Sequence, residues 1–260
     1  MHQIGYLLAL VFGTIWHGTR AIVAGWLGRP RTPGSLLDTV GRDWARFILR
    51  GAGVTVTIEG LEHLAPEGPQ IIAANHQSIF DILAILGWVP LSLKFIAKKE
   101  VFRYPFFGPA VKAAGHIKLD RRDRQKAFAA YEIAALELVE SRTHVLVFPE
   151  GTRSRTGLML PFKKGPAMLA IASGAPLVPC YCAGTFRILP KGSFWVRPRP
   201  VRVMLGPPLS VEGLTYDDRD AFTERLREAV LALRERSVDA EKSEGVQFDA
   251  PSSPGLASRP

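Results

Sequence analysis

Apolar positions along the chain follow two spacings, one typical of helices and one typical of strands. Apolar residues three or four positions apart predict helices, at residues 38–49, 82–86, 123–141 and 222–233. Short apolar or alternating runs predict strands, at residues 54–59, 70–74, 93–97, 145–148, 177–183 and 201–205. The alternation of the two signals predicts the α/β class, with a single domain whose mostly buried central sheet is flanked by helices.

The first apolar run differs from the others because it is long and precedes this alternation. Residues 4–27 are largely apolar, but the uninterrupted part ends at Trp16, before His17 and Arg20. A membrane-spanning helix needs roughly 20 apolar residues, so the segment would span only with its polar groups buried or snorkelled. We expect an interfacial helix or a short helical hairpin with Trp16 and Trp26 at headgroup depth. A core helix of the main domain is the alternative.

These patterns divide the 260-residue chain into three parts. Residues 1–50 form a hydrophobic helical segment that we expect to associate with a membrane, and residues 51–236 form the α/β domain. Residues 237–260 are rich in Ser, Pro and Gly, which predicts a disordered tail.

Composition favours a partner that is both apolar and anionic. The hydrophobic fraction of 47% and the mean hydropathy of +0.09 are high for a chain that is 22% charged, which suggests apolar surface beyond a core. The net charge of +9 suits nucleic acid, an anionic lipid leaflet or a phosphorylated substrate. The tail holds four acidic residues against two basic ones, so the basic character belongs to the folded part.

The first candidate site lies where a predicted strand ends and a helix begins. His76 follows the strand, and Ser78 and Asp81 have the spacing of a capping box. A carboxylate at Asp81 can accept the imidazole N–H, fix the tautomer of the ring and stabilise the imidazolium that forms when the ring takes a proton. Taken alone, this segment is explained equally well by a helix cap beside an ordinary loop histidine.

The second candidate site is a turn after the predicted strand 145–148. Glu150, Gly151, Thr152 and Arg153 lie in this turn. Arg153 can hold a phosphate through two parallel N–H bonds, and Gly151 lets the backbone approach closely. The alternative is a surface ion pair between Glu150 and Arg153.

Other polar residues extend or limit this picture. Arg121, at the end of a predicted strand 115–121, and Lys98 and Lys99 could reach the same anion, although a solvated charge run is the alternative. Cys180 and Cys182 are predicted to be buried free thiols on one face of a strand, in reducing surroundings, and not metal ligands.

Together, and in this order, these segments resemble the glycerolipid acyltransferases, specifically the 1-acyl-sn-glycerol-3-phosphate acyltransferases, over roughly residues 50–210. His76 and Asp81 match the His-x4-Asp element of the family, and Glu150, Gly151 and Arg153 match its Glu-Gly-Thr-Arg element.

The resemblance is weaker in the block that ends at Arg121. Arg121 matches the arginine of the family block Gly-x-Ile-Phe-Ile-x-Arg, but His116, Lys118 and Leu119 depart from its usual residues. The anion-binding role of Arg121 therefore has less support than that of Arg153.

The resemblance implies direct acyl transfer. His76, held by Asp81, would act as general base on the acceptor hydroxyl while it attacks an acyl thioester of coenzyme A or acyl carrier protein. Arg153, with Arg121 and one of Lys98 or Lys99, would bind the phosphate of lysophosphatidic acid. Glu150 would orient the acceptor or the arginines.

No metal or further cofactor is expected, because the thioester is already activated. The protein would act at a membrane lipid surface, on the cytoplasmic face of a bacterial-type inner membrane. The aromatic segment 101–111 would line an acyl groove, touch the bilayer or pack in the core.

Three alternatives remain. A hydrolase would use the same His and Asp on water, and a related acyltransferase would accept another lyso-lipid, such as a lyso-ornithine lipid. A non-catalytic lipid-binding membrane protein would keep the basic surface without needing both His76 and Asp81. Nucleic acid is not an expected partner, because the sequence has no aromatic-interleaved basic motif or zinc-finger pattern.

Overall fold

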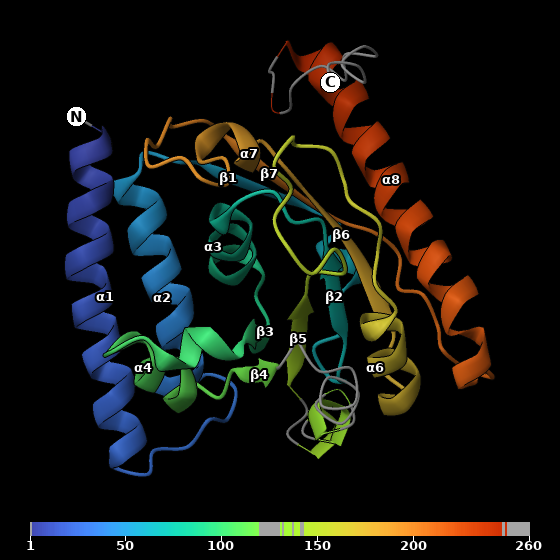
Figure 1. Cartoon of the computed structure of the whole chain (residues 1–260), viewed down its shortest axis with the longest axis horizontal. Coiled ribbons are helices and arrows are strands. Elements are labelled where there is room, and N and C mark those ends of the chain that lie inside the picture. The colour runs from blue at the N-terminus through green and yellow to red at the C-terminus, as the bar shows by residue number, and fades with distance from the viewer. Residues whose placement is uncertain are drawn as a thin grey trace, which may run out of the picture.

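A seven-stranded sheet forms the centre of the computed structural model, which describes residues 2–119, 131, 133–136, 138–140, 143–245 and 248. The strands are β1 (Val56–Glu59), β2 (Ile71–Ala74), β3 (Leu93–Lys98), β4 (Ile117–Leu119), β5 (His144–Val147), β6 (Leu177–Ala183) and β7 (Val201–Leu205). Their order is β1-β7-β6-β2-β5-β3-β4 (Figure 1). The five strands from β6 to β4 are parallel to one another, and β7 and β1 run the opposite way.

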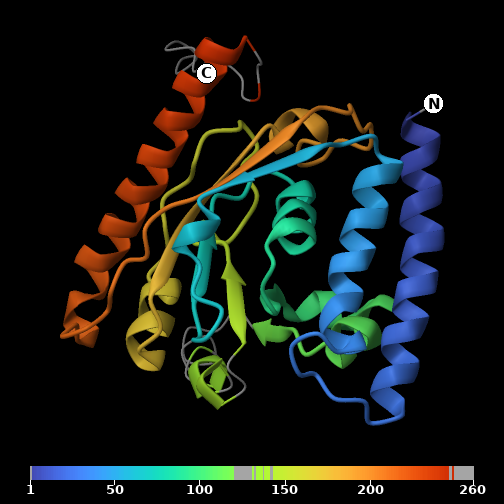
Figure 2. The ribbon, with the colours of Figure 1, turned by 180° about the vertical axis from the view of Figure 1, so that it is seen from behind.

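Helices cover both faces of this sheet, which confirms the predicted α/β class (Figures 1 and 2). The α-helices are α1 (His2–Trp26), α2 (Leu36–Gly51), α3 (Ile79–Trp88), α4 (Phe107–Ala113), α6 (Gly165–Ser173), α7 (Thr185–Ile188) and α8 (Arg219–Glu244). Short 3-10 helices are η1 (Leu61–His63), η2 (Lys99–Arg103) and η3 (Tyr216–Asp218). Alternate residues of β2 separate the two cores: Ile72 and Ala74 pack with α2 and α3, whereas Ile71 and Ala73 pack with α6 and α8.

The carboxyl ends of β6, β2, β5 and β3 lie at one edge of the sheet. Ala73 of β2 is level with Val147 of β5 and Pro179 of β6. Because these strands are parallel, the segments that follow them emerge side by side, at the edge where α/β proteins place their ligands. The sheet therefore brings together the two candidate segments that the sequence separates.

The predicted strand limits agree with the structure to within two residues. Strands 177–183 and 201–205 match in full, whereas β1 begins at Val56 because residues 54 and 55 lie outside the ladder. Of the predicted helix 123–141, residues 131, 133–136 and 138–140 are helical, and the remainder lies outside the described residues.

Pro179 stands in an interior strand, although proline is usually confined to edge strands, strand starts and bulges. Strand β6 lies between β2 and β7. On the β7 side, the regular pairing ends with Cys180 and Leu205, and the N–H of Gly206, just beyond β7, donates to the carbonyl of Pro179 at 2.9 Å. Proline has no N–H with which to continue this pairing, so Pro179 stands where the regular β6–β7 ladder ends.

The amino-terminal segment is one uninterrupted helix, so, of the two predicted forms, the helical hairpin is wrong. Helix α1 lies beside α2 and α4, and small residues make the close approach possible. A Cβ at Gly13 would come within 2.6 Å of the Phe47 ring, and one at Gly18 within 2.6 Å of Phe106. His17, which interrupts the apolar run, is buried on this packed side.

The other side of α1 is apolar and exposed. Its large exposed side chains are Ile4, Leu7, Leu8, Val11, Phe12, Ile15, Trp16, Val23 and Trp26. The helix is long and apolar enough to cross a membrane, by length and composition. Because one side packs on the domain and the other faces outward, α1 is neither a core helix nor a detached anchor.

The last helix continues beyond the predicted start of the tail. We expected disorder from residue 237, but α8 extends to Glu244. Ser237 is fully buried, so the helix still contacts the domain at that point and continues past it. Phe248 packs in the core beyond the helix, and the rest of the predicted tail lies outside the described residues.

Candidate active site

The first motif holds a histidine ring in a fixed position. His76 follows β2, and its Nδ1 lies 2.9 Å from Oδ2 of Asp81 in α3. The ring also stacks on Phe148, which follows β5, with 4.0 Å between the ring centroids. Because a carboxylate only accepts hydrogen bonds, Nδ1 carries the proton and Nε2 keeps the lone pair of the ring. The side chain of His76 is 13% exposed, so Nε2 is available as a base in a sheltered place.

Asp81 is both a helix cap and the partner of the histidine. Its Oδ2 also accepts the backbone N–H groups of Gln77 and Ser78, at 2.7 and 2.8 Å. Its Oδ1 accepts the hydroxyl of Thr185, the first residue of α7. Asp81 is therefore both the capping-box residue of α3 and the hydrogen-bond partner of His76, and the cap fixes the carboxylate that holds the ring.

Residues of the turn after β5 form hydrogen bonds with the backbone of His76. Glu150 is 2% exposed, and its two oxygens accept the backbone N–H groups of His76 at 2.6 Å and Leu160 at 2.8 Å. The N–H of Ser154 donates to the carbonyl of His76 at 2.8 Å. We expected Glu150 to contact the acceptor or the arginines, but both of its oxygens accept backbone N–H groups. Glu150 is therefore a positioning residue. The alternative of a surface ion pair is excluded by its burial.

The buried carboxyl of Glu150 predicts a pH dependence of stability. Burial raises its pKa from 4.5 to about 7, against the opposing effect of the N–H bonds from His76 and Leu160. Because the pKa is higher in the folded state, the resulting stability is fully present below about pH 4.5 and is lost as the pH rises through about 7. We expect the free energy of unfolding to fall over this interval, and the fall to be smaller in Glu150→Gln.

Urea denaturation of both proteins at a series of pH values measures this difference. If the free energy of unfolding changes with pH in the same way in the wild type and in Glu150→Gln, the pH dependence does not arise from Glu150.

Several cationic side chains lie beside this turn, and one of them, Lys191, was not predicted from the sequence. Lys191 follows α7, and its ammonium donates to Oγ1 of Thr152 at 2.9 Å and to the carbonyl of Arg153 at 3.2 Å. Partial desolvation and then the charges of Arg155, Arg153 and Lys98 lower the pKa of Lys191. Mutual repulsion of this kind is relieved when an anion binds among the cations.

The remaining residues of the predicted phosphate site are placed as follows. Gly151 has a φ of +69°, a conformation that favours glycine, and a Cβ there would lie 3.0 Å from the flexible end of Lys163. Lys98 ends β3 at the shared edge, and Lys99 begins η2. Arg121 lies outside the described residues. The neighbouring Lys164, which was not assigned to this site, pairs with Asp220 of α8 at 2.7 Å.

The two cysteines were predicted to be buried thiols and not metal ligands. Cys180 and Cys182 are buried free thiols in the same core, as predicted. Across the described part of the chain, no group of three or more His, Cys, Asp or Glu side chains is placed to hold a metal ion.

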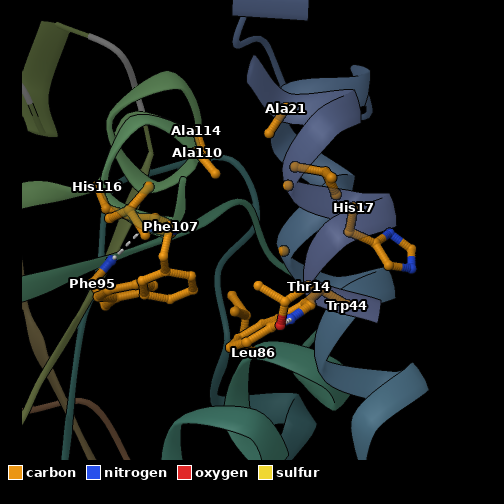
Figure 3. Close-up of a pocket in the computed structure, with 14 residues that line it drawn as sticks. Thr14, His17, Ala21, Trp44, Leu86, Phe95, Phe107, Ala110, Ala114 and His116 are labelled. Carbon is orange, nitrogen blue, oxygen red and sulfur yellow. Dashed lines mark hydrogen bonds between the residues drawn. The ribbon is translucent and has the colours of Figure 1, made fainter. Parts of the chain in front are cut away.

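A small apolar cavity lies elsewhere, between α1, α2, α3, β3 and α4 (Figure 3). Trp44 and Phe107 approach each other across it, and the indole N–H of Trp44 donates to Thr14 of α1 at 3.0 Å. The aromatic segment 101–111 contributes Phe107, Ala110 and Val111. The cavity has a volume of about 50 Å³, far below the roughly 300 to 1,000 Å³ of ligand pockets. In this structure the segment 101–111 therefore serves mainly as packing for α1.

Comparison with known proteins agrees with the two motifs. A family model described as Acyltransferase matches residues 55–183, a range that contains His76, Asp81 and the turn at Glu150. A 1-acyl-sn-glycerol-3-phosphate acyltransferase from Limnanthes douglasii is 36% identical over 69% of the chain and 63% of its own length. One from Cocos nucifera is 33% identical over 85% of the chain and 70% of its own length. The chain thus spans somewhat under two thirds of the Limnanthes relative.

A solved structure extends this similarity to the whole fold. The crystal structure of the 1-acyl-sn-glycerophosphate (LPA) acyltransferase PlsC from Thermotoga maritima superposes with a TM-score of 0.72 at 27% identity. The match covers 91% of this chain and 98% of that one, and so extends beyond the residues of the family model.

Proposed function

The chain belongs to the acyltransferase family, and from this premise we propose that it transfers a fatty acyl group from an acyl thioester to the sn-2 hydroxyl of lysophosphatidic acid, giving phosphatidic acid. One observation carries the proposal. The turn that holds Arg153 is hydrogen-bonded directly to the peptide of His76, so a base and a group of cations share one strand edge.

His76 supplies the proton transfer in this reaction. Nε2 takes the hydroxyl proton as the hydroxyl oxygen bonds to the thioester carbonyl carbon. The carbon–sulfur bond then breaks, and the thiolate leaves and takes up the proton from the imidazolium. Asp81 stabilises the imidazolium while it exists, because its carboxylate lies 2.9 Å from Nδ1.

The cations near Lys191 would hold the phosphate of the acceptor. Arg153 offers a fork of N–H donors, and Lys191, Arg155 and Lys98 add positive charge around it. A phosphate bound there would place a hydroxyl a few bonds away within reach of His76, and such positioning supplies much of the rate of a two-substrate reaction.

Removing one of these cations tests whether they bind the phosphate of the acceptor. We expect Lys191→Met to raise the KM for lysophosphatidic acid by about tenfold, since a charge-assisted contact is lost. Lys164→Met is the matched control, because Lys164 pairs with Asp220 and should leave the KM unchanged. Initial rates of thiol release from acyl-coenzyme A measure both variants.

An equal KM in the two variants would contradict the phosphate site. If product formed with a lyso-ornithine lipid but not with lysophosphatidic acid, the proposed acceptor would be wrong and the proposed acyl transfer would stand.

The location and the donor complete the proposal. The apolar outer side of α1 and the net charge of +9 support a membrane surface, and the buried free thiols support reducing surroundings. The cytoplasmic face of a bacterial-type inner membrane fits these features. Coenzyme A or acyl carrier protein would deliver the acyl chain at that face.

A further inference from the structure

The loop between α7 and β7 is firmly anchored. Val196 is buried in the core beneath α2 and α3, and the N–H of Arg197 donates to the carbonyl of Ile188 at 3.0 Å. The side chain of Gln3, in the first turn of α1, bonds to the loop twice: it donates to the carbonyl of Phe194 at 3.0 Å and accepts from the N–H of Val196 at 2.8 Å. The loop therefore has a defined conformation beside the start of α1.

This anchored loop displays two large aromatic side chains. Phe194 is 85% exposed and Trp195 is 70% exposed, although the next residue, Val196, is buried. Holding aromatic surface in water is unfavourable, and adjacent exposed aromatics on a fixed loop are typical of a surface that contacts something apolar.

The surroundings indicate which apolar partner fits. Figures 1 and 2 both show the loop passing the amino-terminal end of α1. Gln3, which bonds to the loop, is followed by Ile4, the first residue of the exposed apolar side of α1, so the loop lies beside the start of that side. The segment 185–200 contains Arg187, Lys191, Arg197 and Arg199 and no acidic residue. Aromatic side chains next to cations match the interface of an anionic bilayer.

The same loop leads into the candidate active site. Lys191, three residues before Phe194, is the residue whose ammonium bonds to Thr152 and to the carbonyl of Arg153. A bilayer that holds Phe194 and Trp195 would therefore keep the cations near headgroup depth, where the phosphate of a lyso-lipid lies.

We propose that Phe194 and Trp195, with Arg197 and Arg199, form a second membrane contact that docks on anionic lipid and presents the cation cluster at the headgroup layer. The presentation of the cluster to a lipid phosphate rests on the proposed function, whereas the docking itself does not. Binding is therefore measured in a His76→Ala background, where the outcome does not depend on catalysis.

Tryptophan fluorescence tests the contact directly. In the full chain carrying Trp16→Phe and Trp26→Phe, Trp195 is the most exposed indole that remains, since Trp44 and Trp88 are partly buried in helices. We expect vesicles of phosphatidylglycerol with brominated acyl chains to quench this protein, and a further Trp195→Phe change to remove most of the quenching. Equal quenching with and without Trp195 would overturn the proposal.

Vesicle partitioning provides a second readout with a matched control. We expect Phe194→Ser/Trp195→Ser to weaken binding to phosphatidylglycerol vesicles by about tenfold. Leu136→Ser should bind as the parent does, because Leu136 is 64% exposed and its neighbours Ala134 and Ala135 pack in the core with α6 and α8, not with α1. Arg197→Gln/Arg199→Gln should weaken binding to these vesicles but not to phosphatidylcholine.

Unchanged vesicle binding in the aromatic variant would overturn the proposal. If that variant instead lost affinity only for acyl carrier protein, the loop would be a protein-docking surface and the membrane assignment would be wrong.

Discussion

Replacing His76 with alanine is expected to lower kcat for acyl transfer by about 10²- to 10⁴-fold, the usual contribution of a positioned general base. The ring is fixed by the 2.9 Å contact with Asp81 and by stacking on Phe148, so its loss removes a base that is already in place. Release of the thiol from acyl-coenzyme A in the presence of lysophosphatidic acid measures the change.

The fold should survive this substitution. The main-chain bonds of residue 76 to Glu150 and Ser154 do not involve the ring and remain in the variant. His63→Ala is the matched control, because His63 lies in η1, beyond β1, and contacts Glu62. A His76→Ala enzyme as fast as His63→Ala would show that another group takes the proton.

Asp81→Asn is expected to lower kcat by about 10²-fold or more while changing stability by only about 1–3 kcal/mol. The amide oxygen of asparagine can replace Oδ2 and accept the N–H groups of Gln77 and Ser78, and its NH₂ can donate to the hydroxyl of Thr185. The cap is therefore kept, but the negative charge that stabilises the imidazolium is lost.

Thr185→Val separates the two roles of Asp81. It leaves Oδ1 without its hydroxyl donor but keeps the charge, so we expect a similar loss of stability with a much smaller loss of rate. Urea denaturation and the thiol-release assay, made on both variants, give the comparison. Equal rates for Asp81→Asn and the wild type would show that Asp81 is only a helix cap.

The sequence was sufficient to predict that the two candidate segments meet, because the fold follows simple rules. Buried apolar strands before His76 and before Glu150 predicted two segments at strand ends, and parallel strands place such ends together. The spacing from Ser78 to Asp81 predicted the cap, which the structure shows to be shared with the histidine.

Contacts between distant segments could not be predicted in this way. Lys191 lies in a loop without periodicity, and only the folding of that loop over the turn brings it to Thr152. Glu150 was expected to orient the acceptor or the arginines, but its partners are backbone N–H groups that no sequence pattern shows.

Limits of elements were also set by tertiary contacts. His17 and Arg20 suggested a break in the first helix, yet His17 is buried on the packed side and Arg20 lies 3.9 Å from Asp43 of α2, so α1 continues. Burial of Ser237 likewise extends α8 past the compositional start of the tail.

Dependence of thiol release on the acceptor tests the central claim most directly. Purified protein in vesicles receives acyl-coenzyme A with and without lysophosphatidic acid, and thiol and phosphatidic acid are both quantified. We predict that thiol appears only with the acceptor and in equal amount to phosphatidic acid. Thiol released at the same rate without the acceptor, with no phosphatidic acid formed, would show that His76 activates water and would contradict acyl transfer.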